Sequence, residues 1–193
     1  FSTYSQEQML AASEFEGLDR VRELQRKGKG VLFFTGHFGY WEINALVHAL
    51  TLGPMSLLAR PLDNPALHTM LEDIRTRTGN SLIYRQGAVR KIMRDLAGGK
   101  GIAVLIDQHV MPPDAIYVAF FQRTAATTPA LAALALRMGS PVVPVFALPL
   151  PGGRYRFIYE HAVDPPRADT PDAVREFTQR CTDVLEMYVR RHP

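Results

Sequence analysis

The feature of this sequence that most constrains its fold is the alternation of short apolar runs with longer runs of helical character. Segments such as 31–34, 102–107 and 141–148 consist mostly of large or β-branched apolar side chains, which is typical of strands buried on both faces. Glycine and proline separate the runs, as at Gly53 and Pro54. The alternation predicts an α/β fold with a mixed, mostly parallel central sheet flanked by helices.

The boundaries of these runs give a set of expected elements. We expect strands at 31–34, 55–60, 81–84, 102–107, 116–121, 141–148 and 154–160. We expect helices at 43–50, 64–78, 87–97, 128–138 and 171–190. The segment 108–115, which contains two consecutive prolines, is expected to be a loop.

Length and composition predict a single domain that spans residues 1–193. A chain of 193 residues with 47% hydrophobic content is large enough to bury one core. No apolar run approaches the roughly 20 residues that a membrane-spanning helix needs. Only four of the 22 basic residues are lysines. Arginine suits phosphate and carboxylate groups, although nucleotide composition of the genome produces the same enrichment.

The segment 35–42 places a histidine and a carboxylate, His37 and Glu42, between the first strand and the first helix. On an unbroken helix, positions five apart point about 140° away from each other, so we expect His37 to lie in the preceding loop. Gly36 and Gly39 permit a tight loop from which Glu42 reaches back to one ring nitrogen. A histidine held in this way can accept a hydroxyl proton. The alternative is that His37 caps the helix and Glu42 complements its dipole.

Polar residues also follow two later strands. Arg60 comes at the expected end of the second strand, where it and Asn64 can bind a phosphate group, unless Asn64 only caps the next helix. Asp107 and Gln108 end another strand and are candidates for positioning substrate or supporting the site electrostatically. His109 has no second ligand at a suitable spacing, so we expect no metal site.

The middle of the chain is basic. Arg75 and Arg77 precede a helix on which Arg90 and Arg94 lie one turn apart. Such a face can meet an acidic carrier protein or anionic lipid headgroups, or can simply be solvated.

Taken together, five segments resemble the lipid A biosynthesis acyltransferases, which belong to the lysophospholipid acyltransferase superfamily. They are residues 36–42, 60–65, 75–79, 107–108 and 120–128, and the likeness runs in order from about Gly28 to Tyr188. Two departures are visible, because Tyr40 stands where an asparagine is usual and Gln122 where a glycine is usual. These departures bear on substrate detail more than on the chemistry.

The resemblance implies a glycerolipid acyltransferase-like αβ sandwich and a transfer of a fatty acyl group. The donor would be an acyl carrier protein thioester or acyl-CoA, and the acceptor a hydroxyl of a lipid A precursor. His37 would be the general base and Glu42 would hold its ring. The substrate-binding residues would be Arg60, Asn64, Arg75, Asp107 and Gln108. No metal, cofactor or nucleic acid is expected, and the enzyme would act on a membrane surface at the cytoplasmic face of the bacterial inner membrane.

Members of the resembled family carry an N-terminal membrane helix and a C-terminal tryptophan- and basic-rich segment, and we expect this chain to be a domain without them. Three alternatives remain open at this point. The acceptor can be another glycolipid or a phospholipid. The chain can be a catalytically inactive lipid- or carrier-binding module. It can also be a hydrolase that passes the acyl group to water.

Overall fold

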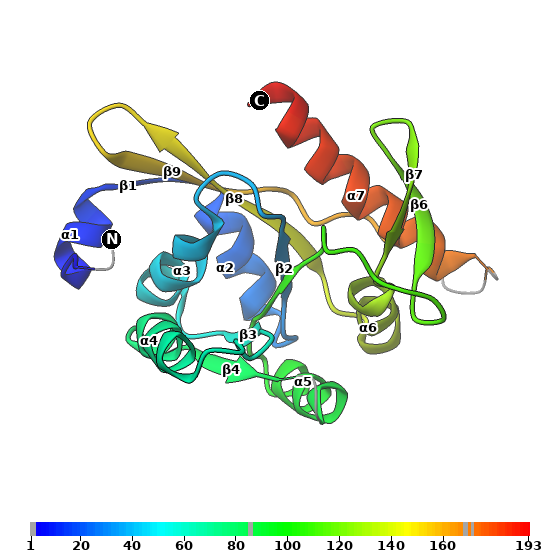
Figure 1. Ribbon diagram of the computed structural model, residues 1–193, viewed down its shortest axis with the longest axis horizontal. Helices are drawn as coiled ribbons and strands as arrows, with labels where there is room; N and C mark the ends of the chain where they lie inside the picture. Colours follow the sequence, from blue (N-terminus) through cyan, green and yellow to red (C-terminus); the bar gives the residue numbers. More distant parts are fainter. Residues whose placement is uncertain (1–2, 85–86, 168–169, 171) are drawn as a thin grey trace.

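A computed structural model of the chain describes residues 3–84, 87–167, 170 and 172–193, and Figure 1 shows the arrangement of its elements. The strands are β1 (Ser13–Glu16), β2 (Leu32–Thr35), β3 (Ser56–Leu58), β4 (Ser81–Ile83), β5 (Ile102–Leu105), β6 (Ile116–Phe120), β7 (Arg123–Thr127), β8 (Val142–Leu150) and β9 (Arg154–Tyr159). The α-helices are α1 (Gln6–Ala11), α2 (Leu18–Arg26), α3 (Asn44–Leu52), α4 (Pro65–Thr76), α5 (Ala88–Ala97), α6 (Ala130–Met138) and α7 (Ala173–Arg191). A short 3-10 helix, η1 (Trp41–Ile43), leads into α3.

Seven strands form the central sheet in the order β1-β9-β8-β2-β5-β3-β4. The neighbouring strands are parallel except for β8 and β9, which pair antiparallel through a tight connection. Strands β8, β2, β5, β3 and β4 therefore run in the same direction, and their carboxyl ends lie at the same edge of the sheet. This edge is where sites form in α/β folds.

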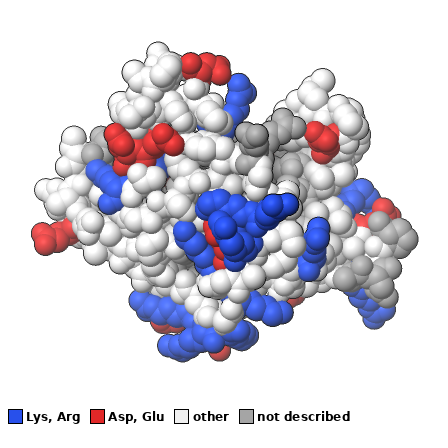
Figure 2. All heavy atoms as spheres, turned by 90° about the horizontal axis from the view of Figure 1, so that it is seen from below, with Lys and Arg blue, Asp and Glu red and all other residues white. Residues whose placement is uncertain are grey.

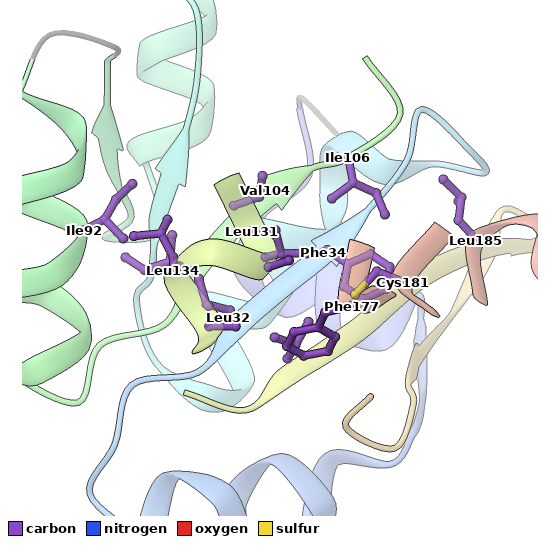
Figure 3. Packing of buried hydrophobic residues seen from close by; sticks show 14 of the residues in the cluster. Leu32, Phe34, Ile92, Val104, Ile106, Leu131, Leu134, Phe177, Cys181 and Leu185 are labelled. Carbon is purple, nitrogen blue, oxygen red and sulfur yellow. The ribbon is translucent and has the colours of Figure 1, made fainter. Parts of the chain in front are cut away.

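One face of the sheet packs against α5, α6 and α7. Leu32 and Phe34 of β2 point to this face, where they meet Ile92, Leu131 and Phe177 in one buried cluster (Figure 3). The other residues of the cluster that the figure labels are Val104 of β5, Ile106 just after this strand, and Leu134, Cys181 and Leu185 of the helices. Burial of this apolar surface is what fixes the three helices on the sheet.

The opposite face packs against α1, α2 and α3. Val31 and Phe33, which alternate with Leu32 and Phe34 along the same segment, belong to a second buried cluster with Val21 of α2 and Val47 of α3. Every residue of β2 is buried. The strand is therefore covered on both faces, as its continuous apolar sequence predicts.

The structure confirms the α/β fold and the mostly parallel mixed sheet. The strand predicted at 55–60 is shorter, at Ser56–Leu58, and the helix predicted at 64–78 spans Pro65–Thr76 with Asn64 as its cap. The sequence did not predict any element before residue 31, so α1, α2 and β1 were not expected, and it did not predict β7 either. β1 becomes a strand by pairing with the distant β9, and β7 is short and rich in alanine and threonine. Residue 171, where the last helix was expected to begin, lies outside the described residues.

Strands β6 and β7 form a separate two-stranded sheet rather than part of the central sheet. The hairpin lies beside α7 (Figure 1). The side chain of Gln179 on α7 accepts a hydrogen bond from the Ala119 amide at 2.7 Å and donates one to the Ala119 carbonyl at 2.9 Å. Glu186, two turns further along α7, accepts from the amide of Phe121 at 2.6 Å. These hydrogen bonds attach the hairpin to the helix.

Basic side chains gather on the face that is seen from below in Figure 1, where α4, β4 and α5 lie (Figure 2). On α5, Arg90 and Arg94 are exposed, while Lys91 donates a hydrogen bond to Asp95 at 3.0 Å. A surface of this kind attracts anionic partners over distances set by ionic strength. Among the helices that the structure describes, none has the length and apolar character needed to cross a bilayer.

His48 lies on the buried side of α3, where only 2% of it is exposed. Its ring packs edge-on against Phe33, with 4.6 Å between the ring centroids. Burial lowers the pKa of His48 to about 3, because the charged form would lose its hydration. The native protein therefore keeps this ring neutral across the physiological pH range.

The depressed pKa of His48 predicts a loss of stability in acid. Below about pH 6.5 the unfolded state binds a proton on this residue that the native state does not bind. The free energy of unfolding should therefore fall by about 1.4 kcal/mol per pH unit as the pH drops from about 6.5 toward 3. This contribution should be absent in His48→Leu. Urea unfolding of both proteins between pH 4 and 8 measures it, and parallel pH dependences would contradict the assignment.

Candidate active site

The pairing of β2 with β5 determines the position of the site. The register aligns Thr35 with Leu105 at the carboxyl ends of the two strands. Continuing each chain by two residues leads to His37 and Asp107. The two residues therefore leave the sheet side by side although they are far apart in the sequence.

Asp107 makes two hydrogen bonds with His37. Its Oδ2 accepts the backbone N–H of His37 at 2.6 Å, and its Oδ1 lies 2.9 Å from Nδ1 of the ring. Since a carboxylate only accepts hydrogen bonds, Nδ1 carries a proton, and in the neutral ring the lone pair is therefore on Nε2. The His37 side chain remains 43% exposed, whereas that of Asp107 is 25% exposed. The pair presents an oriented proton acceptor at the carboxyl edge of the sheet.

Two glycines permit the close approach of the loop. A Cβ atom at Gly36 would lie 3.0 Å from Oδ2 of Asp107 and 2.9 Å from the Leu185 side chain. Gly39 has a φ of +60° and a Cβ there would lie 2.3 Å from the carbonyl oxygen of Ala147. That same carbonyl accepts the N–H of Tyr40 at 2.9 Å. The loop is thereby fixed to β5 at one end and to β8 at the other.

Glu42 does not hold the histidine ring, contrary to the sequence-based expectation. Its two carboxylate oxygens accept from Nε and Nη2 of Arg75 on α4, at 2.6 Å and 3.0 Å. The hydrogen bond with Glu42 raises the pKa of Arg75. Glu42 lies in η1, after the loop has turned away from His37, so its carboxylate points toward α4. Asp107 takes the place beside the ring that was expected for Glu42.

Glu42 is connected to His37 through its neighbour Trp41. Trp41 directly precedes it in η1, and the rings of Trp41 and His37 meet edge to face with 4.8 Å between centroids. The bidentate pair of Glu42 with Arg75 holds η1 in place, and η1 holds Trp41 against the histidine. The side chains of Arg75 and Glu42 are 21% and 26% exposed, so little water competes for the pair.

A second group of polar side chains lies beyond Arg75 on α4. The hydroxyl of Tyr84, just after β4, donates a short hydrogen bond to Glu72. Burial and this hydrogen bond raise the pKa of Tyr84 to about 12. Glu72 also lies 3.5 Å from Nε2 of His68, one turn earlier on the helix. The carboxyl end of β4 therefore carries its own polar cluster beside the Glu42–Arg75 pair.

The remaining predicted residues divide into two groups. Arg60 follows β3 with its side chain 84% exposed and lies 3.6 Å from Asp63. Gln108, next to Asp107, is also exposed. Asn64 instead caps α4, because its Oδ1 accepts from the amides of Ala66 and Leu67 at 3.0 Å and 3.2 Å. Its side-chain oxygen is thus engaged in holding the helix.

The contact of Asp107 with His37 is the feature of the candidate site that sequence reasoning missed. The signal was present, because both residues stand two positions after a buried apolar strand. It required knowing that the two strands are parallel neighbours, which the sequence alone leaves undetermined. Proximity in sequence favoured Glu42 instead.

The arrangement can remove a proton from a hydroxyl group bound near Nε2 of His37. A thiol nucleophile is not suited to the same task here. Cys181 is buried in the core between α7 and the sheet, and burial raises the pKa of its thiol to about 12. A residue in this state stays protonated and out of contact with solvent.

Comparison with known proteins gives the same family along the whole chain. The model of the bacterial lipid A biosynthesis acyltransferases matches residues 2–193. The lipid A biosynthesis myristoyltransferase of Escherichia coli is 25% identical over 93% of this chain and 55% of its own length. The lipid A biosynthesis acyltransferase 1 of Shigella flexneri is 26% identical over the same shares. The chain thus spans about half the length of these relatives.

The tautomer of His37 shows whether Asp107 or Glu42 is the carboxylate that holds the ring. In Asp107→Asn, the amide oxygen can accept the backbone N–H while the amide nitrogen faces Nδ1 and donates to it. The ring should then carry its proton on Nε2 instead of Nδ1. Nitrogen-15 NMR of the neutral histidine ring, recorded in the protein before and after the substitution, measures this change.

The matched control is Glu42→Gln, which changes the other carboxylate by the same chemistry. This variant should leave the Nδ1–H tautomer of His37 unaltered, because Glu42 contacts Arg75 and not the ring. A tautomer change in Glu42→Gln together with none in Asp107→Asn would show that Glu42 holds the ring in solution.

Proposed function

The chain belongs to the bacterial lipid A biosynthesis acyltransferase family, and on this premise we propose that it transfers a fatty acyl group to a lipid hydroxyl, with His37 as general base. The donor we propose is an acyl carrier protein thioester and the acceptor a lipid A precursor. The observation that carries the proposal is the exposed ring of His37, oriented by Asp107 at the carboxyl edge of the sheet. Family membership supports the substrate class in this proposal, and the geometry supports His37 as the base.

In the proposed reaction, Nε2 of His37 takes the proton of the acceptor hydroxyl as its oxygen attacks the thioester carbonyl. Asp107 keeps the ring oriented and stabilises the imidazolium that forms. When the tetrahedral intermediate collapses, the carbon–sulfur bond breaks and the proton passes from His37 to the departing sulfur. An ester and a free thiol result, and no covalent enzyme intermediate is needed.

Glu42 and Arg75 have a supporting role in this proposal. Both nitrogens of one edge of the Arg75 guanidinium face Glu42, so the arginine is committed to this carboxylate and not primarily to substrate. The pair keeps Trp41 against the ring of His37. Arg60 is the residue we assign to a phosphate of the acceptor or of the donor's carrier arm, because its side chain is 84% exposed beyond β3. Gln108 is exposed next to Asp107, where it can contact substrate.

We place the reaction on a membrane surface, at the cytoplasmic face of the bacterial inner membrane. This placement is supported by the lipid named in the family's description. The exposed arginines of α5 offer a surface for an acidic carrier protein or for anionic headgroups. Acyl-CoA in place of the carrier thioester, or another glycolipid or phospholipid acceptor, would use the same base.

The proposal predicts that transfer depends on His37 and Asp107. His37→Ala should lower kcat by about 10²–10⁴-fold, and Asp107→Asn should also lower it strongly because the ring then presents the wrong tautomer. Glu42→Gln should cost less than Asp107→Asn. The measurement is the rate at which a labelled acyl carrier protein thioester acylates a lipid A precursor. The exposed His161→Ala serves as control and should retain the wild-type rate.

Product analysis separates the alternatives. Free fatty acid without acylated lipid, formed by the wild type, would identify a hydrolase. Binding of both substrates without either product, also with other lipid acceptors, would identify a binding module and overturn the proposal. A larger loss in Glu42→Gln than in Asp107→Asn would overturn the division of roles between the two carboxylates.

A further inference from the structure

The buried carboxamide of Asn80 lies between the helices that carry the Glu42–Arg75 pair. Asn80 directly precedes β4 and is 5% exposed. Its Nδ2 donates to the carbonyl oxygen of Ala45 at 2.9 Å and lies 3.3 Å from the carbonyl oxygen of Arg75. Its Oδ1 accepts the N–H of Met55 at 3.0 Å. In the flipped orientation, an oxygen would face two carbonyl oxygens, so the contacts fix the amide as it stands.

The two carbonyl oxygens that Asn80 contacts belong to the two backbone segments that carry Glu42 and Arg75. Ala45 is the second residue of α3, which directly follows the η1 turn that contains Glu42. The other carbonyl is that of Arg75 itself, in the last turn of α4. The helices are therefore connected twice, by the side chains of the ion pair and by the amide of Asn80 between their backbones.

A bidentate pair is sensitive to the distance between the backbones that carry it. The fork of Arg75 meets both oxygens of Glu42, at 2.6 Å and 3.0 Å, only while the two planar groups face each other. A small sliding of α4 against α3 would retain one hydrogen bond and lose the other. Asn80 opposes that sliding because its own hydrogen bonds span the same gap.

We propose that Asn80 is a positioning residue of the active site, which sets the separation of α3 and α4 at which Arg75 binds Glu42 through both oxygens. The constraint passes through Glu42 to Trp41, and from there to the ring of His37. The effect of Asn80 on the reaction rests on the acyl-transfer function proposed above. The effect of Asn80 on the Glu42–Arg75 pair is independent of that function.

Ser81, the next residue in the chain, provides a matched control. Its Oγ lies 2.9 Å from Oγ of Ser56 and accepts from Nζ of Lys100 at 2.8 Å. Ser81 thus joins the starts of β3 and β4, much as Asn80 joins β4 to Met55. Its contacts continue through Ser56 to Asp95 and not to the Glu42–Arg75 pair. The Ser81→Ala substitution therefore shows the effect of losing hydrogen bonds at this place that do not involve the Glu42–Arg75 pair.

The first measurement follows the Nε–H of Arg75 by ¹H–¹⁵N NMR in the full protein, where the bidentate pair should slow its exchange with water. In Asn80→Ala and Asn80→Asp this signal should broaden or disappear, whereas in Ser81→Ala it should persist. Asn80→Asp keeps an acceptor for the Met55 amide, so an effect that both variants share comes from the lost donor. If the alanine variant does not fold, the aspartate variant gives the result.

The second measurement tests coupling to the reaction. Asn80→Ala should lower kcat by about tenfold with little change in KM, and it should lower the rate no further when Glu42→Gln is already present. Ser81→Ala should lower the melting temperature but keep kcat within about twofold of the wild type.

Two outcomes would overturn the inference. One is an unchanged Arg75 Nε–H signal in both Asn80 variants. The other is multiplicative losses of rate in the double variant, which would show that Asn80 acts independently of Glu42. If the wild type transfers no acyl group, the proposed function fails, and the NMR signal still decides whether Asn80 positions the ion pair.

Discussion

The parallel pairing of β2 with β5 is the interaction on which the rest of the structure depends. Its register aligns Thr35 with Leu105, so the backbone alone brings a histidine and an aspartate from distant segments to the same place. The amide of Ile106 continues the ladder by donating to the carbonyl of Thr35 at 3.1 Å. Just beyond this last backbone hydrogen bond, the carboxylate of Asp107 makes its hydrogen bonds with His37. A slip of one residue would move His37 away from Asp107 and would also exchange the faces of β2.

The same strand explains why polar chemistry is confined to its end. Leu32 and Phe34 belong to one buried cluster, and Val31 and Phe33 to the other. A strand covered on both faces cannot carry a functional polar side chain without a partner for it. The side chains of His37 and Asp107 therefore lie beyond the strands, where the chain leaves the two layers of helices. Glycines at that exit keep the loop close enough for backbone and carboxylate to meet.

The sequence was sufficient for the fold class and for most elements, because buried parallel strands are continuous apolar runs and the helices between them have clear ends. It was insufficient where structure arises from distant pairing. Strand β1 exists because residues 13–16 pair with β9, which lies far away in the sequence. The same reason applies to the site: His37 could be identified from its local setting, but its partner Asp107 depends on strand order. Glu42 was assigned to the ring from proximity in sequence, whereas Arg75, far along the chain, holds it in the structure.

The attachment of the β6–β7 hairpin to α7 has a consequence for association between molecules. A two-stranded sheet has open edges, and an open edge can pair with a strand of another chain. At Ala119, both the N–H and the carbonyl of β6 are already bonded to the amide side chain of Gln179, which imitates a neighbouring strand. A helix side chain thereby closes the ladder at this position. The hairpin can extend from the domain without offering, at that point, a template on which aggregates grow.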